Sequence, residues 1–551
     1  MDYSKLVEVY ENLEATPKKL EKADIVSEFL KKLEDEEIII ALPLLEGKIY
    51  HESEEMEVGI AGKLIISTLQ KLGFSKEEIH EALKETGDLG LTAEKLSAKK
   101  RQMSLFKQKL SIQKVYGSMR ELATHEGKNS QLRKQNILLE LINFAEPNEA
   151  KYITRAVLEE LRLGIAEGIL RDAIAKAYGV SPATVERAYS LKTDFSKVAL
   201  IAKNKGAAGL VDVELEFGKP IKVMLAEKSE SLKKALEDAI EPAVEIKYDG
   251  LRMLIQKKGD KIWIFTRRLE NVTKQFPDIA EICRKNILAD EAIVDGETIG
   301  IKDGRPAPFQ ELSKRIHRKY HIKGLSKEIP AQVNLFDCLL ADKKSLLDEH
   351  FSKRRAALEK IIKVERGKLE LAKQIQTKDL EEAEEFYQKA LLEGHEGVMV
   401  KSLNKPYQPG KRVGNMYKVK PEKETLDVVI TGANWGEGRR ANWLATFLLS
   451  IRDEETGELM EIGKMGTGLT DEQFKEATEI LTPLIEFEKD NAVKIKPKIV
   501  IEVGYQDIQR SPNYASGFAL RFPRLIRFRD DKSIDDVDTL ERLKALFKRG
   551  A

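Results

Sequence analysis

The feature that most constrains the fold is a change of sequence pattern near residue 217. Before about residue 213, apolar residues recur at the spacing of amphipathic helices, as they do in residues 6–13. After a glycine- and proline-containing stretch at 217–226, runs with strand-like alternation dominate up to about residue 422. From about residue 423, short strands between glycine turns have the length and spacing of a small barrel. The pattern predicts a helical domain (1–213), a mixed domain (214–422) and a strand-rich domain (423–551).

Composition narrows the class of protein. At 551 residues the chain is too long for one hydrophobic core, and its 34% charged and 42% hydrophobic residues are typical of a soluble globular protein. No apolar run reaches the length of a membrane span, and the first residues do not form a signal peptide. The two cysteines, Cys283 and Cys338, are too few for a four-cysteine zinc module or a disulfide framework. We therefore expect a cytoplasmic protein with no membrane partner.

Residues 247–252 (Lys-Tyr-Asp-Gly-Leu-Arg) follow an alternating apolar run and contain a turn-forming Asp-Gly. Alternation places Glu245 and Lys247 on one face of the strand and the apolar residues on the other, so the lysine points away from the core. Such a lysine is a nucleophile where burial or neighbouring cations lower its pKa. Because K-x-D-G arises by chance in about one of ten chains of this length, it needs support from other residues.

Charged residues recur at the ends of other predicted strands. They are Arg267, Glu297, Glu396, Lys418 and Lys420. Carboxylates are ligands that Mg²⁺ prefers, and lysine and arginine bind phosphates, so this set suits a nucleoside triphosphate with a divalent metal. No glycine-lysine pair is followed by Ser or Thr with a glycine five residues upstream, which excludes a P-loop. A different nucleotide-binding fold is therefore expected.

The order of motifs resembles that of ATP-dependent DNA ligases, specifically the archaeal group related to the eukaryotic replicative enzyme. In the mixed domain the matching motifs are Lys-Tyr-Asp-Gly-Leu-Arg (247–252), Thr-Arg-Arg (266–268), Asp-Gly-Glu (295–297), Phe-Asp (336–337), Glu-Gly-Val-Met-Val-Lys (396–401) and Tyr-Lys-Val-Lys (417–420). In the last domain they are Arg-Phe-Pro-Arg (521–524) and Arg-Asp-Asp-Lys (529–532). Each motif alone is weak, but their order covers essentially the whole chain. One departure is Tyr417, which stands where the family usually has tryptophan.

The resemblance implies a fold and an activity. The fold would be an all-α DNA-binding domain, an α+β nucleotidyltransferase (adenylation) domain and a C-terminal OB-fold β-barrel that moves between a closed and a DNA-encircling state. The activity would be the sealing of nicks in duplex DNA during replication, repair and recombination, with ATP and Mg²⁺ (or Mn²⁺). Its implied partner is nicked DNA, and the protein would be a monomer associated with the nucleoid in the cytoplasm.

The resemblance also implies roles for individual residues. Lys247, with Asp249 beside it, would attack the α-phosphate of ATP and carry AMP. Backbone near Glu245 would read the adenine amino group, Phe336 would stack on adenine, and Glu297 would bind the ribose hydroxyls. Glu297 and Glu396 would hold the metal. The phosphate contacts would be Arg252, Arg267, Arg412, Lys418 and Lys420, and the group that orients pyrophosphate in the first step would be Arg524, Arg529, Asp531 and Lys532.

A basic segment from Lys95 to Arg120 contains eight Lys or Arg and no Asp or Glu. It is either a solvated helix face or a surface that follows phosphates. Within it Gln102, Leu105 and Phe106 are similar to the sliding-clamp-binding motif of archaeal ligases, and the alternative is a helix end with both apolar residues buried. The pair His317 and His321 has the spacing of helical metal ligands, but without a third ligand nearby we expect two surface residues.

Other functions share part of these motifs. An RNA ligase or an mRNA capping guanylyltransferase has K-x-D-G but not the large helical N-terminal domain. An NAD-dependent ligase is disfavoured because the chain has no zinc-binding cysteine set. A non-catalytic DNA-binding scaffold would retain the fold without the activity, which the intact charged residues at 247, 297, 396, 418 and 420 argue against.

Overall fold

The computed structural model divides into two compact units, Met1–Lys420 and Pro421–Ala551. It describes every residue except 55, 57, 100–108, 126, 128, 303–304, 308, 317–321, 422–424, 437–439, 441, 490 and 551. The predicted clamp contacts Gln102, Leu105 and Phe106 lie outside the described residues, as do His317 and His321. No helix among the described residues combines the length and the apolar character needed to cross a membrane.

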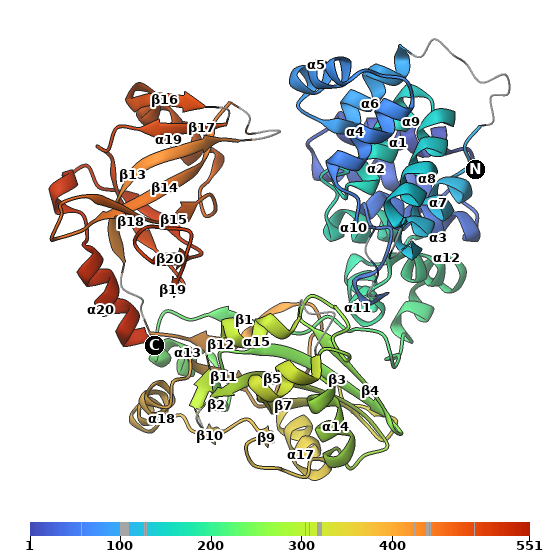
Figure 1. Ribbon diagram of the computed structural model, residues 1–551. Helices are drawn as coiled ribbons and strands as arrows, with labels where there is room; N and C mark the ends of the chain where they lie inside the picture. Colours follow the sequence, from blue (N-terminus) through green and yellow to red (C-terminus); the bar gives the residue numbers. More distant parts are fainter. Residues whose placement is uncertain are drawn as a thin grey trace. The chain divides into compact units, whose positions relative to one another are not determined.

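The described chain up to Val211 is built of helices, as predicted (Figure 1). These are α1 (Tyr3–Glu14), α2 (Lys19–Leu30), α3 (Asp35–Glu46), η1 (Glu52–Glu54), α4 (Gly62–Lys71), α5 (Lys76–Thr86), α6 (Leu89–Ala98), α7 (Ile112–Thr124), α8 (Ser130–Phe144), α9 (Pro147–Val157), α10 (Glu167–Tyr178), α11 (Pro182–Lys192) and α12 (Phe195–Val211). The apolar stripe of α1 is buried in their common core. Ser75 and Ser181 cap α5 and α11 through their side chains, because each accepts a hydrogen bond from the third backbone N–H of its helix.

A buried ionic network ties α1 to α9 in this helical part. The Glu14 carboxylate accepts hydrogen bonds from Lys151 at 2.7 Å, Tyr152 at 2.8 Å and Arg155 at 2.9 Å. Arg155 also donates to Asp88, the N-cap of α6, at 3.2 Å. Burial opposes ionisation of Glu14, but the three hydrogen bonds outweigh it and lower the pKa of Glu14 to about 2.

The next part of the same unit contains two sheets. The first has the order β1 (Leu225–Lys228), β12 (Arg412–Val419), β11 (Gly397–Ser402), β2 (Pro242–Lys247) and β10 (Gln374–Gln376). The second has the order β4 (Lys261–Thr266), β3 (Leu251–Lys258), β5 (Glu291–Lys302), β7 (Ala331–Ala341) and β8 (Lys344–Ser345), with β6 (Arg305–Ala307) beside β5 and β9 (Leu369–Leu371) beside β7. The chain passes from one sheet to the other between β2 and β3.

Helices cover one face of each sheet. Helices α13 (Leu232–Asp238) and α18 (Leu380–Leu392) share a core with the apolar side of β2 and β11, which includes Val244 and Ile246. Helices α14 (Pro277–Asn286) and α17 (Phe351–Ile361) share another with the second sheet, and α15 (Phe309–Ile316) and α16 (Ile322–Glu328) follow β6. The opposite faces carry the charged residues, and they approach each other where Lys401 of β11 lies over Phe336 of β7. The predicted alternation along β2 is thereby confirmed.

The unit Pro421–Ala551 is rich in strands. Its main sheet has the order β15 (Leu459–Met465), β14 (Leu444–Arg452), β13 (Leu426–Trp435), β17 (Ala492–Ile495) and β16 (Ile485–Lys489), and β18 (Val500–Gly504) pairs with both β13 and β21 (Arg524–Phe528). The remaining elements are β19 (Asp507–Arg510), β20 (Phe518–Arg521), α19 (Asp471–Leu481), η3 (Thr482–Leu484), η4 (Ile534–Asp536) and α20 (Leu540–Gly550). A single bridge between Thr467 and Arg524 links the β15 side to β21. The described pairings confirm a strand-rich domain, while continuous closure into a barrel stays a prediction.

Candidate active site

Lys247 lies at the point where the chain crosses between the two sheets. It is the last residue of β2, and Gly250 immediately precedes β3. A Cβ at position 250 would lie 2.3 Å from the carbonyl oxygen of Thr298, so only glycine permits the backbone at 250 to approach the backbone of β5 this closely. The Asp-Gly turn therefore brings the lysine to the charged faces of both sheets.

Glu396 connects Lys247 to the end of strand β12. Its carboxylate accepts hydrogen bonds from the ammonium groups of Lys247 and Lys420, and its backbone N–H donates to the Lys247 carbonyl at 3.0 Å. The next residue, Gly397, has φ +146°, and a Cβ there would lie 2.2 Å from the Val419 carbonyl oxygen. Glycine at 397 thus lets this turn approach β12 closely enough for one carboxylate to reach both lysines.

The pKa of Lys247 lies below that of an ordinary lysine. Burial lowers the pKa of Lys247; the carboxylates of Glu297 and Asp249 oppose this effect, and the charges of Arg252 and Arg267 add to it. A lowered pKa increases the fraction of lysine with a free lone pair at neutral pH. The structure therefore brings Asp249, Arg252, Arg267 and Glu297 to the lysine, as the sequence predicts.

Arg252 on β3 is anchored before any substrate binds. Its guanidinium donates to both carboxylate oxygens of Asp295, at 3.0 and 2.6 Å, and to the Met224 carbonyl at 2.7 Å. The Tyr407 hydroxyl donates to the same carboxylate at 3.0 Å. Asp295 is fully buried, so this bidentate pair fixes the guanidinium firmly. Asp295 and Tyr407 are supporting residues that the sequence did not identify, although Asp295 lies within the Asp-Gly-Glu motif.

Glu297 offers a carboxylate close to Lys247. Within the described residues its carboxylate has no hydrogen-bond or ion-pair partner, and it lies opposite Arg252 in the pairing of β5 with β3. Burial raises the pKa of Glu297 to about 7, although the charges of Lys247 and Arg252 oppose the shift. A half-buried carboxylate without a partner is suited to accept hydrogen bonds from a ligand or to bind a cation.

Phe336 has a half-buried ring beside Arg252. The Lys401 ammonium lies 4.3 Å from the ring centroid, and the Arg252 guanidinium carbon lies 5.4 Å from it. Lys401 is paired with Glu245, whose other carboxylate oxygen accepts from Gln374 at 2.8 Å. Glu245 is 1% exposed, and its side chain is fully engaged with these partners. Sequence reasoning missed the supporting roles of Lys401 and Gln374.

Strand β12 and the end of β4 add cations. Burial lowers the pKa of Lys418, and the nearby charges of Arg412, Lys247, Arg267 and Lys228 lower it further. No carboxylate pairs with Lys418 among the residues that the structure describes. Arg412 is exposed and donates to the Ala226 carbonyl at 3.3 Å. This excess of positive charge beside Lys247 suits an anionic ligand with several phosphates.

The predicted residues of the last domain cluster around a carboxylate on β13. Arg529 donates to both oxygens of Asp427, at 2.9 and 3.1 Å, and Lys532 donates to it at 2.6 Å. The other edge of the Arg529 guanidinium binds Asp531, at 2.8 and 2.7 Å. Arg524 lies apart from this cluster, at the start of β21. The sequence predicted three members of the cluster and missed Asp427.

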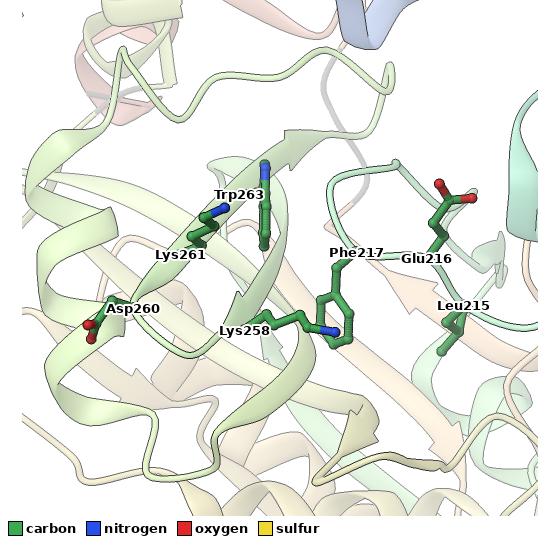
Figure 2. Close-up of a pocket in the computed structure, with 7 residues that line it drawn as sticks. All are labelled: Leu215, Glu216, Phe217, Lys258, Asp260, Lys261 and Trp263. Atoms are coloured by element: carbon green, nitrogen blue, oxygen red, sulfur yellow. The ribbon is translucent and has the colours of Figure 1, made fainter.

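A separate cavity of about 720 Å³ lies where the segment before β1 meets the β3–β4 hairpin (Figure 2). It is lined by Leu215, Glu216, Phe217, Lys258, Asp260, Lys261 and Trp263. In Figure 2 the Lys258 side chain extends across the Phe217 ring, with its ammonium 5.2 Å from the ring centroid. None of the predicted site residues lines this cavity; they gather instead around Lys247.

Comparison with known proteins identifies the family. Three family models match the chain. The model described as "DNA ligase N terminus" matches residues 2–175, the model described as "ATP dependent DNA ligase domain" matches residues 223–420, and the model described as "ATP dependent DNA ligase C terminal region" matches residues 440–532. A DNA ligase of Thermococcus onnurineus is 46% identical over 100% of this chain and 98% of its own length, and one of Nanoarchaeum equitans is 43% identical over 100% and 98%. This chain belongs to the ATP-dependent DNA ligases. The solved structure Pmar-Lig_Pre has the same ligase fold at 18% identity, with a TM-score of 0.60 over 95% of this chain and 99% of its own.

The carboxylates of this ligase are compatible with a metal held mainly by its substrate. No group of three or more His, Cys, Asp or Glu side chains placed to hold a metal occurs in the described parts of the chain. Mg²⁺ usually keeps several waters and is bound through one or two carboxylates together with substrate phosphates. Glu297 and Glu396 on either side of Lys247 fit that pattern.

Proposed function

We propose that this ligase seals nicks in duplex DNA and that Lys247 carries AMP between ATP and the DNA. The observation that carries the proposal is the position of Lys247 where the chain crosses between two sheets. Its pKa is lowered, and the cations Arg267, Arg412 and Lys418 lie nearby. An RNA ligase or a capping enzyme is not favoured, because the chain matches DNA ligases over its full length, including the helical N-terminal part.

In the first step the Lys247 Nζ attacks the α-phosphorus of ATP. An N–P bond forms, the bond to the β-phosphate oxygen breaks, and pyrophosphate leaves. AMP then passes to the 5′-phosphate at the nick, and the 3′-hydroxyl displaces AMP as the phosphodiester bond forms. Each step is a transfer at phosphorus, so its catalysis depends mainly on in-line positioning and on neutralising phosphate charge.

The residues around Lys247 support an arrangement of bound ATP. The Phe336 ring would stack on adenine, the backbone of β2 at Glu245 would bind the adenine amino group, and Glu297 would accept from the ribose hydroxyls. Asp249 would act beside Lys247. The phosphates would contact Arg267, Arg412, Lys418 and Lys420, together with Arg252, which Asp295 holds in place.

Two carboxylates of this site would hold a divalent cation. Glu297 and Glu396 would hold Mg²⁺ or Mn²⁺ together with phosphate oxygens and water. When bound, the cation supplies positive charge against the triphosphate. The chain's own residues have defined tasks: before the reaction Glu396 aligns Lys247 and Lys420, and Glu297 would bind the ribose.

The remaining assignments concern domains and partners. We propose domain limits of 1–213, 214–422 and 423–551, with a C-terminal OB-fold barrel in which Arg524, Arg529, Asp531 and Lys532 orient pyrophosphate during the first step. The partner is nicked duplex DNA, which the protein binds during replication, repair and recombination. The protein acts as a monomer that is associated with the nucleoid in the cytoplasm. A sliding clamp would bind Gln102, Leu105 and Phe106, and Phe106→Ala should then abolish clamp stimulation of sealing while basal sealing stays unchanged.

A nick-sealing assay tests this function. A duplex with one nick is incubated with ATP, Mg²⁺ and either the intact chain, Lys247→Ala or the control Lys373→Ala, which removes an exposed lysine of the same domain that pairs with Glu393. We expect sealing by the intact chain and the control and none by Lys247→Ala. Full sealing by Lys247→Ala would contradict the proposal, and sealing of nicked RNA duplexes in preference to DNA would favour the RNA-ligase alternative.

A further inference from the structure

Arg529 is held between two carboxylates. Asp427 on β13 binds one edge of its guanidinium and Asp531 binds the other, at distances of 2.7 to 3.1 Å. Asp427 also binds the Lys532 ammonium at 2.6 Å. One aspartate of β13 thus sets the position of both cations of the 529–532 motif.

Asp427 is itself fixed by the strand framework. Its backbone N–H donates to the Asp538 carboxylate at 2.8 Å, and the Asp538 N–H donates to the Asp427 carbonyl at 2.8 Å. The Asp427 and Arg529 side chains are only 14% and 12% exposed, so water screens their pairing less than it screens a surface ion pair. The aspartate therefore offers a rigid point of attachment for two flexible side chains.

We propose that Asp427 is a positioning residue for the first step of ligation. It does not touch ATP; it holds Arg529 and Lys532 in the orientation in which they meet the departing pyrophosphate. This inference rests on the proposed function, because it takes the pyrophosphate role of Arg529 and Lys532 from there. Pyrophosphate leaves only in the first step, so the contribution of Asp427 is confined to the formation of Lys247–AMP.

The chain offers a matched control. Glu502 lies directly opposite Asp427 in the pairing of β13 with β18. It binds Arg527 at 2.7 Å, an arginine outside the group assigned to pyrophosphate. Asp427→Asn and Glu502→Gln each remove one carboxylate charge from neighbouring strands at nearly constant volume. The Glu502 charge also acts on Arg529, but its hydrogen bonds are to Arg527 and Thr425. Only the first change therefore alters hydrogen bonds to Arg529 and Lys532.

The test separates the first step from the last in the full-length protein. Single-turnover formation of Lys247–AMP from labelled ATP is measured over a range of ATP concentrations, and sealing of a nick that already carries a 5′-linked AMP is measured without ATP. For Asp427→Asn we expect the maximal rate of the first step to fall by about 10- to 100-fold, as for a misplaced catalytic group. Sealing of the pre-adenylylated nick should stay within about twofold of the intact chain, and Glu502→Gln should change neither rate by more than about twofold.

Three outcomes would overturn the inference. Formation of Lys247–AMP by Asp427→Asn at the unchanged or an increased rate would show that the aspartate does not position the cations. An equal loss in both reactions would show a general structural role. A similar loss in Glu502→Gln would show that the effect comes from surface charge. If the intact chain forms no Lys247–AMP from ATP, the proposed function is wrong and the inference is wrong with it. If the intact chain and Asp427→Asn form Lys247–AMP at the same rate, only the inference is wrong.

Discussion

The Glu396 carboxylate is in direct contact with the Lys247 ammonium, and its second oxygen binds Lys420. This contact holds the nucleophile at the end of β2 and aligns it with the end of β12. In the proposed reaction Lys247 would exchange this carboxylate for the α-phosphate. The same carboxylate would then be available to hold a divalent cation.

Replacing Glu396 should therefore impair the first step strongly. We expect Glu396→Ala to slow formation of Lys247–AMP by about 10²- to 10³-fold, the range for loss of one preorganised electrostatic group. Labelling of the protein by α-labelled ATP measures this rate. The half-buried Glu393, three residues earlier, pairs with Lys373 and provides the control Glu393→Ala. Equal labelling of the two variants would contradict the assignment.

The ring of Phe336 should govern the affinity for ATP. Stacking of a base on an aromatic side chain contributes about 1–3 kcal/mol, so Phe336→Ala should raise the ATP concentration for half-maximal labelling by about 5- to 150-fold. Phe336→Tyr keeps the ring and should behave like the intact chain. An unchanged ATP dependence in Phe336→Ala would place adenine elsewhere.

The buried pair of Asp337 and Arg354 should stabilise the adenylation domain. The two side chains are 3% and 1% exposed and are joined by hydrogen bonds of 2.7 and 3.0 Å. Asp337→Ala leaves a buried arginine without its partner and should lower the free energy of unfolding by about 3–5 kcal/mol. Chemical denaturation measures the change. The control Lys353→Ala breaks the neighbouring ion pair of Lys353 with Glu349, in which the lysine side chain is 70% exposed. It should lower the free energy of unfolding by less than about 1 kcal/mol. Equal losses of stability in the two variants would contradict the account.

Glu14 should make the stability of the helical part depend on pH. Its pKa in the folded protein is about 2, below the ordinary value of 4.5, so its ionised form stabilises the fold above pH 4.5. This contribution is lost as the pH falls from 4.5 through about 2. The thermal midpoint of Glu14→Gln should therefore lie below that of the intact chain at pH 7, and the difference should shrink below pH 4.5. A difference that stays constant down to pH 2.5 would contradict the assigned pKa.

Local patterns predicted much of this fold because they act within a few residues. The apolar period of α1, the serine caps of α5 and α11, and the alternation that turns Lys247 away from the core all depend on neighbours in the sequence. The Asp249-Gly250 pair likewise predicted a turn between the two strands that flank it.

Partners that are distant in the sequence were not predictable in the same way. Asp295 binds Arg252 and Tyr407 from strands and loops up to 112 residues away, and no single segment signals that meeting. Asp427 is 102 residues from Arg529, and an aspartate on a strand looks like any exposed carboxylate until β13 pairs with β18 and β18 with β21. Closure of the last domain depends on similarly distant pairings, which explains why strand content was easier to predict than a barrel.

The most direct test of the central claim is covalent labelling of Lys247. The intact chain and Lys247→Ala are incubated with Mg²⁺ and α-labelled ATP, GTP or NAD, before and after pyrophosphate removes any AMP already bound, and the denatured protein is examined for label. The account predicts label from ATP alone, on the intact chain and not on the variant. Label on Lys247→Ala, label from GTP instead of ATP, or no label from any donor after pyrophosphate treatment would contradict it.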